Sequence, residues 1–193
     1  MFGYKRKKCV IIGCGRSGTS YISKVLSETG LDIQHETSGV DGSANWYRTP
    51  YPRIWLKLRH EFIVHQVRNP LNCISSCQTL NEHSWTKINR HISFSSEEPL
   101  VLRCAKYWYH WNVMAEPKSD LLIRLENLEN DLPALCKVLN VHFDERVLES
   151  VSQKTNTREN NYETVTWEMI NEFSPEYHDK CKELALKYGY SIS

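Results

Sequence analysis

The alternation of apolar runs with helical patterns along the chain predicts an α/β protein. The first apolar run, Cys9-Val10-Ile11-Ile12, stops at glycines, as buried parallel strands often do. Further strands are expected at 31–35, 54–58, 62–67 and 121–125. Helical patterns fill much of the chain between these runs, and this alternation favours a parallel sheet with crossover helices.

Start and stop signals locate the helices. The first is expected from Gly18 to Gly30, because glycine often ends a helix. A second helix over 70–80 begins with proline, whose missing N–H costs nothing at that position. Prolines also bound a long helix over 99–117.

Two later helices carry their own caps. Either Asn130 or Asp131 is expected to cap a helix that presents leucines on one face. Ser174 caps the last helix and Gly189 ends it, with a proline in first position after the cap. These signals complete the prediction of a central parallel sheet flanked by helices.

The composition is that of a globular protein. A chain of 193 residues has the size of one domain by the usual ~100–200 residues, so residues 1–193 are expected to form a single domain. Its 40% apolar and 24% charged residues exclude a disordered chain. The net charge is only +1, whereas a protein that binds nucleic acid through phosphate contacts shows a large basic excess. Nucleic acid is therefore not an expected partner, and a bound anion must be met by a local site.

The cysteines and the N-terminus point to a reducing compartment. The seven cysteines include no CxxC pair, and Cys73 and Cys77 are interpreted as core residues of a helix, so no metal site is predicted. No segment approaches the ~18 apolar residues of a membrane span. The apolar run after Lys5-Arg6-Lys7-Lys8 is too short for a signal peptide, so the protein is expected to be cytoplasmic.

A glycine-rich loop is the first candidate site. Gly13-Cys14-Gly15-Arg16-Ser17-Gly18-Thr19-Ser20 lies between the first strand and the first helix. Backbone N–H groups and the helix N-terminus together suit a phosphate. The ATP-type loop has a lysine where this chain has Thr19, and its basic residue here is Arg16. An ordinary ATPase or kinase is therefore disfavoured, and a cation on the bridging oxygen of a different anhydride is indicated.

Two motifs resemble those of the sulfotransferases that use 3′-phosphoadenosine-5′-phosphosulfate (PAPS). Arg16-Ser17-Gly18-Thr19-Ser20 resembles their 5′-phosphosulfate loop, which usually carries Lys in place of Arg. The run 64–70, ending in Arg68-Asn69-Pro70 and followed by Ser76, resembles their 3′-phosphate signature. An arginine at the carboxyl end of a strand is placed where ligands of open α/β sheets gather, and it can hold a phosphate bidentately.

The resemblance implies a three-layer P-loop-type fold, PAPS as donor, adenosine 3′,5′-bisphosphate as product, and no metal. It assigns cofactor binding to Gly15, Arg16, Ser17, Gly18, Thr19, Ser20, Tyr21, Arg68 and Ser76. Tyr21 falls where the cytosolic branch has a tryptophan that stacks on adenine, and a core role for it is equally open. The family's Arg-Lys-Gly run over the 3′-phosphate is absent, which leaves Arg158 as a candidate substitute.

The resemblance also indicates the catalytic groups. In the carbohydrate-modifying branch a glutamate after the second strand is the base, which matches Glu36, with His35 as the alternative. The alternative that Glu36 only forms an ion pair with a nearby Arg or Lys remains open. Arg16 would neutralise the leaving phosphate. The acceptor is expected to be a hydroxyl group, with a carbohydrate or a glycolipid as the candidate class.

Loops and tryptophans suggest where the acceptor binds. Residues 37–52 and 81–98 are polar and irregular, the second with room for a short helix, and would cover the acceptor. Trp46 and Trp85 in these loops are the expected acceptor contacts. Trp108 and Trp111 are expected in the core, because they share the apolar face of the long helix.

Two other functions stay open on the residues alone. A P-loop small-molecule kinase would need Mg²⁺ and an aspartate on a strand, but the strand at 121–125 carries Arg124 near its end. A non-catalytic nucleotide-binding protein on the same fold is the other alternative.

Overall fold

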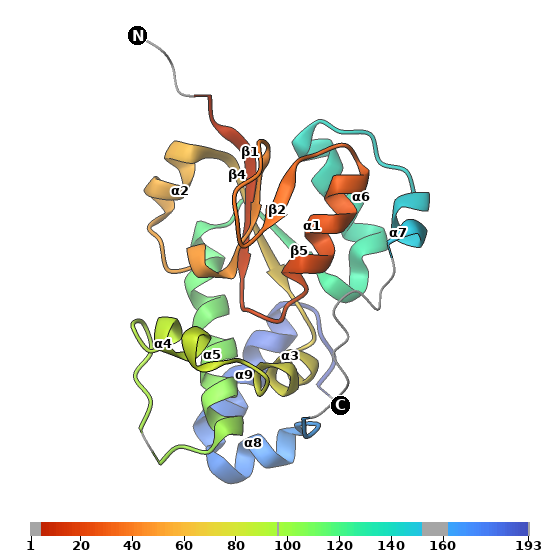
Figure 1. Ribbon diagram of the computed structural model, residues 1–193. Coiled ribbons are helices and arrows are strands. Elements are labelled where there is room, and N and C mark those ends of the chain that lie inside the picture. The colour runs from red at the N-terminus through yellow and green to blue at the C-terminus, as the bar shows by residue number, and fades with distance from the viewer. Residues whose placement is uncertain (1–4, 96, 152–161, 193) are drawn as a thin grey trace.

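The computed structural model describes residues 5–95, 97–151 and 162–192, and these contain one five-stranded parallel sheet (Figure 1). The strand order is β2-β3-β1-β4-β5. The strands are β1 (Lys7–Gly13), β2 (Ile33–His35), β3 (Gly42–Ala44), β4 (His60–Val67) and β5 (Leu121–Arg124).

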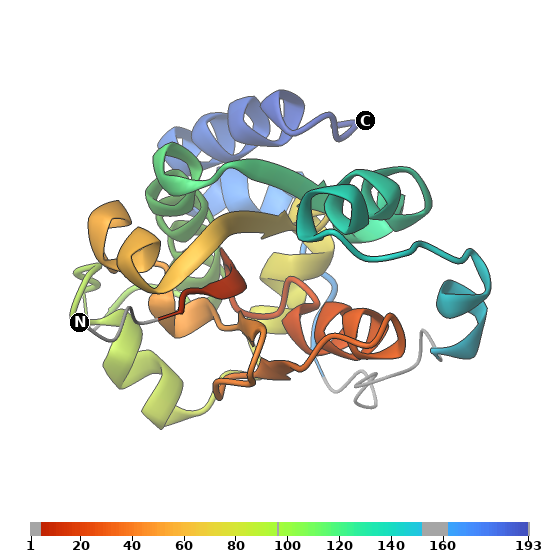
Figure 2. The same ribbon diagram turned by 90° about the horizontal axis from the view of Figure 1, so that it is seen from above.

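Helices cover both faces of the sheet, so the molecule has three layers (Figure 2). Helices α1 and α6 pack on one face, and α2 and α5 pack on the other. Helices α8 and α9 pack on α5 rather than on the sheet. The helices are α1 (Thr19–Glu28), α2 (Arg53–Arg59), α3 (Pro70–Cys77), α4 (Glu82–Ile88), α5 (Leu100–Ala115), α6 (Leu128–Leu139), α7 (Arg146–Ser150), α8 (Trp167–Phe173) and α9 (Pro175–Lys187). The predicted fold class is confirmed.

The sheet topology brings the carboxyl ends of β1 and β4 side by side. From β1 the chain moves to one side of the sheet through β2 and β3, and it then returns to the other side through β4 and β5. Strands β1 and β4 pair directly, with Gly13 opposite Gln66. The loops that follow these two strands therefore leave the same edge of the sheet, which is where open α/β sheets bind ligands.

Most of the predicted elements are confirmed. Strands are present at the four predicted segments other than 54–58. Ser174 caps α9 by accepting a hydrogen bond from the Tyr177 N–H at 3.4 Å. Trp108 and Trp111 are buried on α5, as their helical spacing predicted.

Three local predictions were wrong. Residues 54–58 form part of helix α2, because a short apolar run does not by itself distinguish a strand from a helix. Strand β3 was missed inside the expected loop, since its residues Gly-Ser-Ala carry little strand propensity and are held by pairing with both β1 and β2. Helix α6 begins at Leu128, before the expected cap, and the Asp131 carboxylate instead accepts the Arg124 N–H at 2.7 Å.

None of the helices in the described part of the chain has the length and apolar character needed to cross a membrane.

The buried His65 predicts a pH dependence of stability. Burial lowers the pKa of His65 to about 4, although a hydrogen bond between its Nε2 and Asn112 Oδ1 opposes this. Because the unfolded chain then binds more protons, the free energy of unfolding should fall by up to about 3 kcal/mol as pH falls from about 6.5 to about 4. Urea denaturation across this range should show a flatter slope for His65→Gln. The same change at the exposed His83 should leave the slope unaltered, and an unchanged slope for His65→Gln would contradict the assignment.

Candidate active site

The loop between β1 and α1 is shaped as an anion cradle. Its glycines permit close approach: a Cβ at Gly13 would lie 2.2 Å from the Gln66 carbonyl oxygen, and one at Gly18 would lie 2.8 Å from Leu125. Gly18 has φ +90°, a left-handed conformation that starts α1 at little cost. The first N–H groups of α1 have no partner within the helix and suit an anion.

Residues far along the sequence hold this loop from behind. The Gly13 N–H donates to Thr49 Oγ at 3.0 Å, and the Thr49 hydroxyl donates to the Gly13 carbonyl at 2.9 Å. The Gly15 N–H donates to the buried Tyr107 hydroxyl at 2.8 Å. Thr49 and Tyr107 were not predicted, because no local pattern marks a side chain that reaches a distant backbone. The loop is therefore held in place by Thr49, which directly follows η1 (Trp46–Arg48), and by Tyr107 on α5.

The two predicted phosphate motifs meet at one place. Arg16 Nε donates to Ser76 Oγ at 3.0 Å, and Arg68 Nη1 donates to the Arg16 carbonyl at 3.1 Å. Arg68 follows β4, and the Asn69 side chain caps α3 by accepting the Asn72 N–H. Two guanidinium groups and a hydroxyl are thus gathered beside the glycine loop, a donor set suited to phosphate.

An acidic residue that sequence reasoning missed holds this corner. One carboxylate oxygen of Glu126 accepts the Asn69 N–H at 2.9 Å, and the other accepts the Tyr190 hydroxyl at 2.9 Å. Burial and the neighbouring Glu126 raise the pKa of Tyr190, so its phenol remains a donor. Glu126 therefore ties the C-terminal segment to the start of α3.

The predicted base and its alternative lie at the end of β2. Glu36 Oε1 accepts the Trp46 indole N–H at 2.9 Å and lies 3.8 Å from His35 Nε2. His35 Nε2 also lies 3.1 Å from the Thr19 hydroxyl oxygen, within the phosphate loop. Desolvation lowers the pKa of His35, although the Glu36 charge opposes this, so the imidazole is neutral near pH 7. Both side chains are partly exposed and line the cleft described below.

Backbone strain is concentrated here. Among the described residues, three non-glycine residues have positive φ: Arg16 at 71°, Glu36 at 59° and Asn140 at 53°. Asn140 ends α6, where a left-handed residue is common. Arg16 and Glu36 have no such role, and strained residues of this kind cluster at functional sites.

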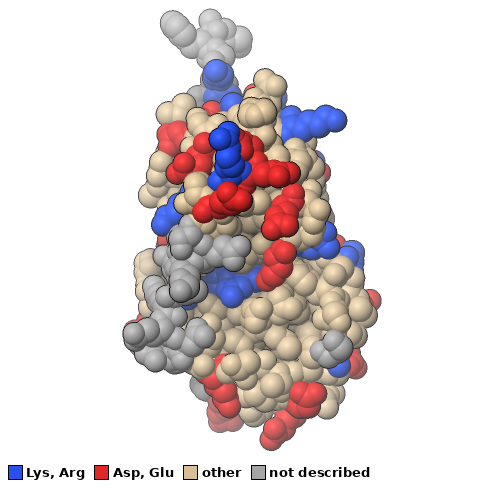
Figure 3. Space-filling model, turned by 90° about the vertical axis from the view of Figure 1, so that its right-hand side faces the viewer, with Lys and Arg blue, Asp and Glu red and all other residues tan. Residues whose placement is uncertain are grey.

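Most of the residues predicted for the site line a cleft of about 860 Å³. Of the predicted site residues, those that line it are Gly15, Arg16, Gly18, Thr19, Ser20, Tyr21, His35, Glu36, Arg68 and Ser76. Residues from the two expected cover segments also line it: Trp46, Tyr47, Asn81 and Ser84. Figure 3 views one side of the molecule, where Lys or Arg atoms lie in a recess below a group of acidic side chains.

Two residues from the sequence analysis do not line the cleft, and a third is not described. Ser17 is 1% exposed and its hydroxyl donates to the Cys14 carbonyl at 2.6 Å, so its side chain faces the loop's own backbone. Trp85 lies in α4, packed against Phe94 and under the Arg103 guanidinium, rather than in the cleft. Arg158 lies outside the described residues.

The fold and the cleft together define an α/β protein with a polar cleft at the switch point of its sheet, and the donor groups gathered there suit a phosphate. No family model and no curated protein sequence matches the chain. Among solved structures it is similar to the sulfotransferase domain from the curacin biosynthetic pathway, at 11% identity and TM-score 0.56, over 98% of this chain and 99% of that chain. This chain therefore has the fold of that sulfotransferase domain.

A second similar structure is that of mouse sulfotransferase SULT7A1 complexed with PAP. It is 17% identical, with TM-score 0.48, over 97% of this chain and 86% of that chain.

The hydrogen bond to the Tyr107 hydroxyl should contribute measurably to the free energy of unfolding. Tyr107→Phe leaves the buried Gly15 N–H without its acceptor, which should lower the free energy of unfolding by about 1–3 kcal/mol. Chemical denaturation measures the change. Tyr109→Phe, on the same helix but partly exposed, is the matched control and should have a smaller effect. Equal effects of the two changes would contradict the supporting role.

Proposed function

We propose that this protein is a sulfotransferase that moves a sulfuryl group from PAPS to an acceptor hydroxyl. The observation that carries the proposal is the meeting of Arg16, Ser76 and Arg68 at one point of the cleft. The two motifs that resemble the 5′- and 3′-phosphate sites of that family are therefore in contact, which supports two neighbouring anion sites. The similarity in fold to a sulfotransferase domain supports the same reading.

The residues present fit this donor. Arg16 and the first N–H groups of α1 suit the phosphosulfate, and Arg68 with the Ser76 hydroxyl suits the 3′-phosphate. Tyr21, at the wall of the same cleft, suits the adenine. PAPS supplies the sulfuryl group when bound, and arginine and backbone donors can neutralise the departing phosphate without a metal.

Glu36 is the proposed general base. Its carboxylate borders the cleft, and the Trp46 indole holds one oxygen in place, which leaves the second to accept the proton of the acceptor hydroxyl. His35 is held by Thr19 of the phosphate loop and is the alternative base. Arg16 and the backbone donors would then stabilise the charge that develops on the leaving phosphate.

The lining beyond Glu36 favours a hydroxyl-rich acceptor. Trp46 and Tyr47 present aromatic rings, and Thr79, Asn81 and Ser84 present hydroxyl and amide groups. Aromatic faces beside hydrogen-bonding side chains suit the alternating apolar and hydroxyl surfaces of a sugar. A carbohydrate or a glycolipid headgroup is therefore the acceptor class that we propose.

Replacement of Arg68 tests the donor site. Arg68→Gln should weaken binding of adenosine 3′,5′-bisphosphate at least about tenfold, because a charge-assisted contact is lost, and should leave 5′-AMP binding nearly unchanged. Thermal-shift titration with both nucleotides and Mg-ATP measures this. Arg59→Gln, at the end of α2, is the control.

The nucleotide titration also decides between donor classes. Stabilisation of the wild-type protein by the bisphosphate without metal supports the sulfotransferase. Stabilisation by Mg-ATP alone would instead indicate a kinase. If no nucleotide stabilises the protein, a non-catalytic protein would be indicated.

Replacement of Glu36 tests the base. Glu36→Gln keeps the shape and should reduce kcat about 10²–10⁴-fold while leaving bisphosphate affinity intact. Sulfate transfer from labelled PAPS to a panel of sugars measures kcat. The parallel change His35→Gln should be milder. The base assignment is wrong if His35→Gln abolishes transfer and Glu36→Gln does not.

A further inference from the structure

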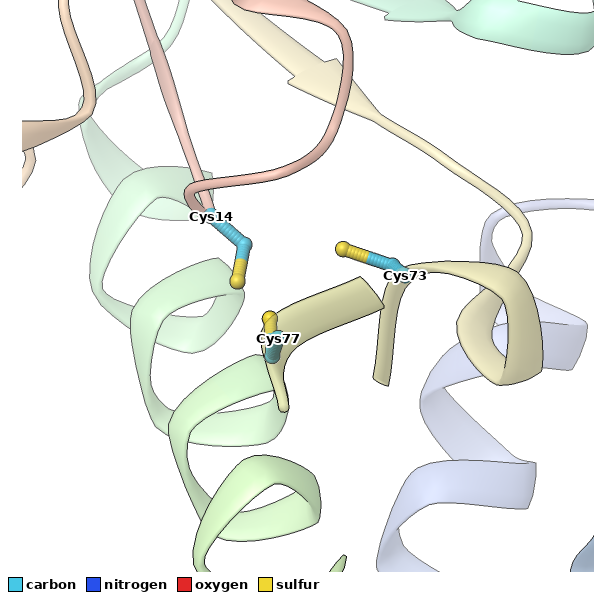
Figure 4. Close-up of side chains that lie close together, drawn as sticks. All are labelled: Cys14, Cys73 and Cys77. Atoms are coloured by element: carbon cyan, nitrogen blue, oxygen red, sulfur yellow. The ribbon is translucent and has the colours of Figure 1, made fainter. Parts of the chain in front are cut away.

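Three cysteines meet behind the phosphate loop. Cys14 comes from the loop itself, and Cys73 and Cys77 lie one turn apart on α3 (Figure 4). Their Sγ atoms all lie within 4.8 Å of one another. All three residues are 0% exposed and none forms a disulfide.

Two of the three thiols share one backbone acceptor. Cys73 Sγ lies 3.5 Å and Cys77 Sγ 3.7 Å from the Gly15 carbonyl oxygen, so both thiols point at the loop backbone. The cluster therefore brings three sulfur donors together in a fully buried position behind the loop.

We propose that Cys14, Cys73 and Cys77 bind one thiophilic d¹⁰ metal ion, with Cu(I) as the expected occupant. Sulfur atoms that share such an ion at about 2.3 Å are roughly 3.8–4.0 Å apart, so less than about 1 Å of contraction closes the site. Three thiolates select soft ions such as Cu(I) and Zn(II) and disfavour Mg²⁺ and Ca²⁺.

The number of donors decides between the two soft ions. A structural Zn(II) site is almost always four-coordinate. In the described part of the chain the metal-competent group has only these three sulfurs. The nearby Tyr107 phenol already accepts the Gly15 N–H. It remains a neutral, poor ligand, and a three-coordinate Cu(I) ion fits better than Zn(II).

Occupancy would connect the phosphate loop to α3. Cys14 lies between Gly13 and Gly15, whereas the other two ligands belong to the helix that carries Ser76. The bound ion would therefore fix the phosphate loop relative to α3, and so the two proposed anion sites relative to each other, from the side opposite the cleft. Each thiol that ligates releases its proton to solvent, so affinity should fall with acid pH.

Anaerobic metal titration of the reduced full chain tests the proposal. Cu(I) is supplied to native protein, and also during refolding because the sulfurs are buried, in competition with the chelator bicinchoninate. We expect about one equivalent of Cu(I) per chain and a rise in Tm of roughly 5 °C or more. A parallel Zn(II) titration against 4-(2-pyridylazo)resorcinol should show weaker binding.

Substitutions locate the ion. Cys14→Ala, Cys73→Ala and Cys77→Ala should each abolish tight binding, whereas Cys104→Ala, equally buried but on α5, should retain it. If an alanine variant does not fold, alkylation of the wild-type chain decides instead: bound Cu(I) should protect only the three cluster thiols during unfolding. Failure of the wild-type protein to bind either ion, or binding retained in all three variants, would overturn the proposal. Zn(II) bound more tightly than Cu(I) would overturn the choice of ion.

The test does not depend on the proposed function. Metal stoichiometry and Tm are read without PAPS or acceptor, so absence of sulfuryl transfer leaves this result unaffected.

Discussion

The parallel pairing of β1 with β4 is the contact on which the rest of the site depends. Gly13 lies so close to the Gln66 carbonyl that a Cβ would fall 2.2 Å from it, and the pairing therefore requires glycine there. Because the two strands are neighbours and parallel, the glycine loop and Arg68 emerge together. Any residue that separated these strands would also separate Arg16 and Arg68, the two arginines of the proposed anion sites.

The cleft has a well-packed layer behind the phosphate loop and charged side chains on its open side. Behind the loop, Thr49 and Tyr107 hold backbone groups that would otherwise be buried without partners. In front, Arg16 and Glu36 keep strained backbone conformations and present opposite charges to the same cleft. A preorganised loop of this kind can stabilise a charge without rearranging when the charge appears. The buried cysteines belong to this packed layer, and a bound ion would further stabilise the loop against α3.

Much of the fold and the central site could be predicted, because their signals are local. Glycines next to a strand predict a cradle, and a proline after Arg68 predicts a helix start, whatever the distant chain does. The prediction of a strand at 54–58 was wrong for the complementary reason. Ile54, Trp55 and Leu58 are more than 60% exposed, so this apolar run does not report burial in the sheet.

The sequence by itself determined the class of fold, most of its strands and helices, the glycine loop, and the residues suited to bind phosphate. These follow from backbone preferences and side-chain chemistry within a few neighbouring residues. Tertiary structure decided which distant groups meet: Tyr107 under Gly15, Glu126 at Asn69, and Cys14 beside Cys73 and Cys77. The physical reason is that such contacts depend on how helices pack across the sheet, and sequence spacing between segments carries no record of that packing.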